Sequence, residues 1–160
     1  AAIGAQMRRI EHRATPVLTY SQLGAGFAIA PLFVVPGLFW GAAAFRPERA
    51  PETIQLLNDL GWLFFIVPVF LGVLQNLTIG FAIISEKGER HIFPRWLGFF
   101  NIWTALLFIP GGAALFFKTG PFAWNGLLAF WVPAGVFGPW FILMAIYVIK
   151  AAKRQAIEGD

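Results

Sequence analysis

Four long apolar runs divide this chain of 160 residues, and they cover residues 23–45, 60–85, 96–117 and 124–149. None of the runs contains an Asp, Glu, Lys, Arg or His. Each holds about the 20 residues with which an α-helix crosses ~30 Å of hydrocarbon, at a rise of about 1.5 Å per residue. The pattern predicts an all-α integral membrane protein, a four-transmembrane-helix bundle. We expect residues 1–160 to form a single domain with spans of about 18–45, 52–85, 95–117 and 123–150.

Basic residues flank these runs unevenly. Nine lie before the first run, between the second and third, and after the fourth: Arg8, Arg9, Arg13, Lys87, Arg90, Arg95, Lys150, Lys153 and Arg154. Only three lie in the other two connections: Arg46, Arg49 and Lys118. Because short cytoplasmic segments carry the excess of Lys and Arg, we expect an up-down-up-down topology with both termini in the cytoplasm. The expected location is the bacterial inner membrane or a plasma membrane.

Composition supports this assignment and narrows the chemistry. Hydrophobic residues make up 58% of the chain and charged residues 12%, whereas about 25% charge is usual in soluble domains. The chain has no Cys, which excludes disulfides, thiolate nucleophiles and Cys-bound metals. The net charge is +4, and the basic residues that produce it lie in the segments beside the runs. We therefore expect the nine basic residues to dock lipid headgroups, at ~1 kcal/mol for each, or a protein partner, and we expect no nucleic-acid binding.

Local sequence signals predict where the second helix begins and where one turn lies. Pro51 and Glu52 are residue types favoured in the first turn of a helix, so we expect the second helix to begin near Pro51, outside the membrane. Lys118-Thr119-Gly120-Pro121 predicts a tight turn, which would make the third and fourth spans antiparallel neighbours.

Proline and glycine positions leave two questions open. Every run contains proline, at Pro31, Pro36, Pro68, Pro110, Pro133 and Pro139. Each removes a helical hydrogen bond and tends to kink its helix. The kinks fit either a hinge or widened pocket near mid-membrane, or ordinary membrane-helix architecture. Gly37 and Gly41 form a GxxxG pattern that predicts close helix packing, within the chain or against another chain.

Neutral polar side chains gather at one level of two runs. They are Gln75, Asn76, Thr78, Asn101 and Thr104. Counted from the expected cytoplasmic ends, they lie roughly 8–15 Å into the membrane. One interpretation is a set of interhelical hydrogen bonds. The other is a binding site in which these residues hold the polar end of a ligand. Phe side chains and the deep Trp103, Trp131 or Trp140 would hold the apolar body of that ligand. A lipid, sterol, quinone or carotenoid would fit, although no motif identifies a cofactor.

Reactive side chains are scarce. The absence of ionisable residues from the runs argues against proton-coupled transport by this chain alone. Glu86, Glu89 and His91 form the only cluster that resembles an active site, but a short surface loop leaves such groups solvated. We therefore assign no catalytic residue and no metal ligand, and we do not expect an enzyme.

The sequence is consistent with three functions. The first is a non-catalytic accessory or structural subunit of a multi-subunit membrane complex, which packs through small-residue and aromatic helix faces against other membrane subunits and lipid. The second is a binding or carrier protein for a hydrophobic small molecule or lipid, with its polar site in the cytoplasmic half of the bilayer. The third is a small membrane enzyme that uses Glu86, Glu89 and His91.

Overall fold

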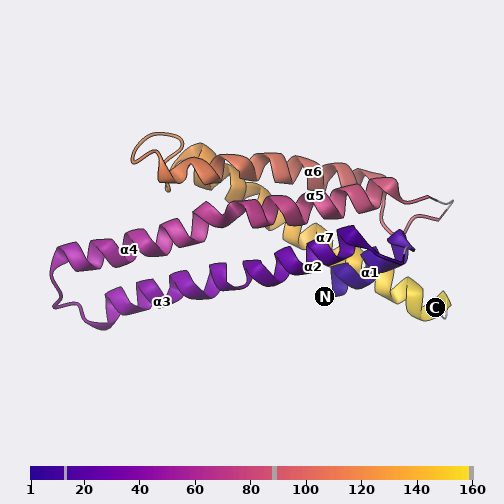
Figure 1. The fold of residues 1–160 in the computed structure, drawn as a ribbon, viewed down its shortest axis with the longest axis horizontal. Coiled ribbons are helices and arrows are strands. Elements are labelled where there is room, and N and C mark those ends of the chain that lie inside the picture. Colours follow the sequence, from indigo (N-terminus) through magenta and orange to yellow (C-terminus); the bar gives the residue numbers. More distant parts are fainter. Residues whose placement is uncertain (13, 88–89, 159–160) are drawn as a thin grey trace.

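The computed structural model describes residues 1–12, 14–87 and 90–158, which form helices and connections without a strand (Figure 1). In chain order the helices are α1 (Ala2–Glu11), α2 (Val17–Ile29), α3 (Pro31–Phe45), α4 (Pro51–Ile66), η1 (Val67–Val69), α5 (Phe70–Ser85), α6 (Arg95–Phe108), η2 (Ile109–Leu115), η3 (Leu127–Trp131) and α7 (Val132–Glu158). η1 and η2 are 3₁₀ helices, and η3 is a π-helix.

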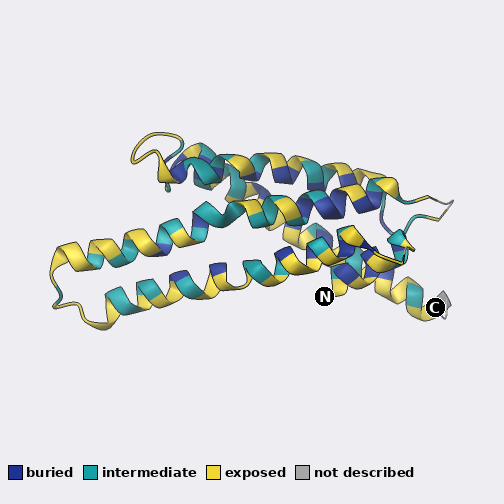
Figure 2. Cartoon of the chain, viewed as in Figure 1, coloured by how far each residue is buried: buried dark blue, intermediate teal, exposed yellow. Residues whose placement is uncertain are grey.

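Among the described residues, four helical stretches are long and apolar enough to span a membrane, which confirms the expected set of four. They are Val17–Phe45, Pro51–Ser85, Arg95–Leu115 and Leu127–Ile157. Large apolar side chains such as Phe27, Leu38 and Phe45 are exposed on them, and exposed residues run the length of α3 and α4 (Figure 2). Apolar surface of this extent suits a hydrocarbon environment and would aggregate in water.

The ends of the molecule differ. Figure 1 places both termini and the connection after α5 at one end, and the connections after α3 and after η2 at the other. The α3–α4 hairpin extends beyond the rest of the molecule at that second end (Figure 1). This fits the lengths, because Pro51–Ser85 has 35 residues and Arg95–Leu115 has only 21.

Proline interrupts all four stretches. Ala30 ends α2 and Pro31 begins α3, while Pro68 has a ψ of 21° inside η1. Pro110 lies near the start of η2, where α6 changes to a 3₁₀ helix, and Pro133 follows η3. These changes follow from the missing proline N–H and the ring's clash with the preceding turn. Pro36 and Pro139 lie inside α3 and α7.

Two local expectations fare differently. The second helix begins at Pro51, as predicted. The tight turn at 118–121 is wrong in its length, because the connection between the last two spanning stretches covers residues 116–126, although Gly120 does adopt a positive φ of 85°. Carbonyl groups of Gly120, Pro121 and Ala123 accept backbone hydrogen bonds in this segment, so several short turns replace the single one expected.

Helix α1 was not predicted, and it closes the end that carries the termini. Its buried Met7 and Ile10 pack with Ile83, Phe93 and Met144 in one apolar core. Both carboxylate oxygens of Glu11 accept backbone N–H groups at the start of α2, from Leu18 at 3.1 Å and from Thr19 at 2.7 Å. This satisfies donors that a helix N-terminus otherwise leaves unpaired.

Candidate functional site

A cavity of about 280 Å³ lies where the interrupted helices meet. Its walls come from α2 to α7, and many of the lining residues flank a proline break: Ile29 and Leu32 beside Pro31, Ile66 and Val69 beside Pro68, Phe108 before Pro110, and Ala129 and Phe130 before Pro133. Helices that bend at the same level separate locally, and side chains do not fill the space. The proline pattern therefore coincides with a pocket.

Aromatic rings form a large part of the cavity wall. Phe33 contacts Phe65 edge-on, with ring centroids 5.7 Å apart, and stacks on Phe137 at 6.2 Å. Phe137 in turn stacks on Trp140 at 6.0 Å and lies 6.5 Å from Phe108. All five residues line the cavity. A flat or branched apolar molecule would meet rings on several sides.

Asn76 supplies the cavity's distinctive polar group. Its side chain is only 1% exposed, lines the cavity, and donates from Nδ2 to the carbonyl oxygen of Gly72 at 2.9 Å. That bond fixes the amide orientation, because two carbonyl oxygens would repel each other there. Asn76 Oδ1 is buried and accepts no hydrogen bond from the part of the chain that the structure describes. An unpaired buried acceptor costs roughly 1–3 kcal/mol, so this atom is suited to a donor from a bound molecule.

Gln75 precedes Asn76 in α5 and also lines the cavity. A Cβ built on Gly26 would lie 3.0 Å from Gln75 Nε2, so the absence of a side chain at Gly26 makes room for the amide against α2. Gln22 of α2 is buried, and its Oε1 likewise has no hydrogen-bond partner within the described residues. Gln22 was not among the five predicted site residues. Its polar side chain directly before the first apolar run was the available signal.

The other three predicted polar residues are held by the protein itself. Asn101, 0% exposed, accepts a hydrogen bond from Trp140 Nε1 at 2.8 Å and donates to the carbonyl oxygen of Leu97 at 2.7 Å. Thr78 and Thr104 donate to carbonyl oxygens of their own helices. The five predicted residues thus separate: Gln75 and Asn76 line the cavity, whereas Asn101 links α6 to α7.

The deep tryptophans and the predicted packing glycines are placed as follows. Of the three tryptophans, Trp140 lines the cavity, whereas Trp103 and Trp131 are 56% and 62% exposed on the outer surface. Gly37 and Gly41 are also exposed, and beyond the backbone of its own helix and its chain neighbours, a Cβ at either position would meet no atom of the described residues within 4 Å. The close approach occurs instead at Gly80 and Gly98, which were not predicted: a Cβ on Gly80 would lie 2.9 Å from the carbonyl oxygen of Gly98.

Most of the predicted docking residues gather around a second cavity at the end that carries the termini. Arg8, Arg9, Lys87, Arg90 and Arg154 line it. Arg95, Lys150 and Lys153 are exposed at other positions, and Lys150 Nζ lies 5.2 Å from the ring centre of Tyr147. Glu86 and His91 also line this cavity, with His91 Nδ1 3.6 Å from Glu86 Oε2. Arg13 and Glu89 lie outside the described residues.

Sequence reasoning did not identify the phenylalanines of the aromatic wall. With 18 Phe in the chain, no spacing distinguishes Phe33, Phe65, Phe108 and Phe137 from those that face outward.

No protein-family model, curated protein or solved structure matches this chain.

Proposed function

We propose that this protein binds a hydrophobic small molecule or lipid in the cavity between its interrupted helices. The observation that carries the proposal is that Asn76 lines an aromatic cavity, while its buried Oδ1 has no hydrogen-bond partner among the described residues. Binding sites for small molecules are mostly apolar, with a few placed polar groups that fix orientation. Here the rings would hold the apolar body, and Asn76 would fix its polar end.

The free acceptor favours one chemical class of ligand. Asn76 Oδ1 requires a donor, so a hydroxyl or amide N–H is needed on the ligand. A sterol, a quinol or a hydroxylated lipid meets that requirement, whereas a hydrocarbon carotenoid does not. A volume of about 280 Å³ is somewhat below the usual range for drug-sized ligands, about 300–1,000 Å³. A ligand larger than the cavity would extend between the helices toward the lipid.

Identification of co-purified molecules tests this function. The protein is solubilised gently from its own membrane, and bound small molecules are identified by mass spectrometry. We expect one hydroxyl- or amide-bearing apolar molecule in the wild type, and at least a tenfold lower amount in Asn76→Leu. Thr78→Val is the matched control, because the Thr78 hydroxyl bonds only to its own helix and the residue does not line the cavity. Ala134→Phe, which places a ring in the cavity wall, should also reduce the amount.

The outcome that contradicts the proposal is specific. If Asn76→Leu and Ala134→Phe retain the same molecule at the wild-type level, the cavity is not its site. If the folded wild type carries no such molecule, and added sterol or quinol does not bind, the proposal fails.

The accessory-subunit hypothesis is kept as a second candidate because of one feature. The GxxxG face at Gly37 and Gly41 has no neighbour in the described chain, and such faces let membrane helices approach closely. The same gentle purification reports any protein that accompanies the chain.

We also propose the orientation that the basic residues favour, with four alternating crossings and both termini in the cytoplasm. Nine of the twelve Lys and Arg residues lie in the segments assigned to that side, which the positive-inside rule supports.

A further inference from the structure

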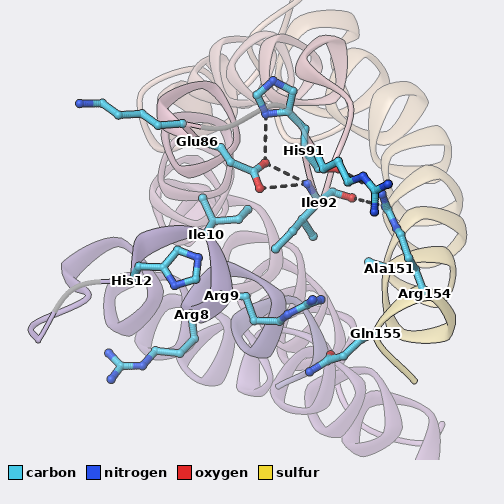
Figure 3. A pocket seen from close by; sticks show the side chains of 12 residues that line it. Arg8, Arg9, Ile10, His12, Glu86, His91, Ile92, Ala151, Arg154 and Gln155 are labelled. Atoms are coloured by element: carbon cyan, nitrogen blue, oxygen red, sulfur yellow. Dashed lines mark hydrogen bonds and ion pairs between the residues drawn. The ribbon is translucent and has the colours of Figure 1, made fainter. Parts of the chain in front are cut away.

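A second cavity, with a volume of about 540 Å³, lies at the end that carries both termini (Figure 3). Three segments that are far apart in the sequence form it: the second half of α1, the connection after α5, and the last turns of α7. It shares no lining residue with the aromatic cavity. What this cavity binds is therefore independent of what binds in the aromatic cavity.

The lining of this cavity is strongly basic. Among the described residues it contains five cationic side chains and one carboxylate, Glu86. Both oxygens of that carboxylate accept a hydrogen bond from the backbone N–H of Ile92, at 2.9 and 3.1 Å. Glu86 therefore stabilises the connection between α5 and α6. Several like charges around one concave surface focus the electrostatic potential and raise the local concentration of anions.

The cavity is built on a fixed base. Arg154 donates to the carbonyl oxygens of His91 at 3.2 Å and Ile92 at 2.9 Å, which ties α7 to the connection (Figure 3). Gln6 Nε2 donates to Gln155 Oε1 at 3.2 Å, which ties α1 to α7. Beneath them Phe93 and Ala151 are buried in the apolar core. Cationic groups held in place before binding lower the entropic cost of binding an anion.

We propose that this basic cavity binds a phosphate group that carries more than one negative charge. Guanidinium groups match phosphate oxygens in paired hydrogen bonds, and Lys adds a point charge. A phosphate monoester carries about −1.5 to −2 at neutral pH, so it compensates more of the surrounding positive charge than a single carboxylate does. The phosphate belongs either to a lipid headgroup at the membrane surface or to a soluble phosphate compound. Both sources share this chemistry.

The experiment uses the full chain in nanodiscs and separates the two sources. In the soluble arm, inorganic pyrophosphate is titrated onto protein in zwitterionic nanodiscs by calorimetry. In the lipid arm, the nanodiscs contain phosphatidic acid, whose headgroup is a phosphate monoester, and retained lipid is counted by native mass spectrometry. The test variant is Arg8→Gln with Lys87→Gln, two exposed residues of the cavity rim. The matched control is Arg95→Gln with Lys153→Gln, which removes the same charges at exposed positions outside the cavity lining.

We expect at least one probe to bind the wild type, with about a tenfold loss in the test variant and less than a twofold change in the control. The arm that shows this pattern identifies the source of the phosphate. Equal losses in both variants would reduce the effect to general surface charge and overturn the proposal, as would the absence of binding in both arms. Thermal unfolding verifies that the variants are folded, and Lys87→Gln alone replaces the double variant if that is unstable.

Discussion

At the scale of single residues, two asparagines show how tertiary contacts divide similar side chains. Asn76 and Asn101 are both buried, and both donate to a carbonyl oxygen four residues earlier in their own helix. The difference lies at the carbonyl end of each amide. Asn101 Oδ1 accepts a hydrogen bond from the Trp140 indole N–H, whereas Asn76 Oδ1 has no partner in the described part of the chain. We therefore expect Asn101 to contribute to stability, and we propose Asn76 as the residue that contacts a ligand.

Asn101→Leu should destabilise the protein by about 1–2 kcal/mol. A side-chain hydrogen bond between membrane helices is worth ~0.6 kcal/mol on average and at most ~1.7, and the change also leaves the buried Trp140 N–H unpaired. Unfolding followed by tryptophan fluorescence in detergent measures the effect. Thr104→Val is the control, because the equally buried Thr104 bonds only to the carbonyl of Phe100 in its own helix. Equal stability of the two variants would contradict the role given to the Asn101–Trp140 bond.

At the scale of helices, glycine position decides which elements pack. Gly80 of α5 and Gly98 of α6 face each other, so the two backbones lie close together. Gly37 and Gly41 of α3 carry the recognisable spacing, yet they face away from the described chain. The GxxxG spacing indicates only that one face of a helix lacks large side chains. Which face meets another helix depends on how the whole chain folds.

Gly80→Ala should destabilise the protein by about 1–3 kcal/mol, as overpacking does in closely packed interiors. The added Cβ would lie 2.7 Å from Ile102 Cγ1 and 2.9 Å from the carbonyl oxygen of Gly98, and the backbone atom cannot move cheaply. Thermal unfolding in one detergent compares it with Gly24→Ala, whose Cβ would meet nothing within 4 Å. We expect the control to be neutral or slightly more stable, because alanine favours helix more than glycine does. A stable Gly80→Ala protein would show that α5 and α6 lie further apart.

At the scale of the whole molecule, the two ends have different characters. One end is closed by α1 and carries the basic cavity, whereas the α3–α4 hairpin extends from the other (Figure 1). The aromatic cavity lies between them, at the level where prolines interrupt the four spanning stretches. The proposed orientation would place the basic cavity at the cytoplasmic surface.

Cysteine labelling tests that orientation directly, because the chain contains no native Cys. Ala152→Cys and Thr119→Cys place single thiols at exposed positions near the two ends. In intact cells, a membrane-impermeant maleimide should label Thr119→Cys, and it should reach Ala152→Cys only after the membrane is opened. The proposed topology would be refuted by the reverse pattern, or by labelling of both thiols from the same side.

The sequence by itself determined the number of long apolar helices, the start of the second at Pro51, and the prolines at which helices are interrupted. Those features depend on local properties: hydrophobic length, and the missing N–H of proline. The long connection at 116–126 and the packing of α1 were not predicted, because both depend on contacts with distant segments.

Only the tertiary structure decided which residues form the two cavities. It brought Gln75 and Asn76 together with Phe33, Phe137 and Trp140, and it left Asn101 to join two helices. The spanning stretches are mostly apolar, and for such helices lipid and protein interior have similar polarity. Hydrophobic pattern therefore cannot separate inward from outward faces, and helix crossing and bending determine which side chains meet.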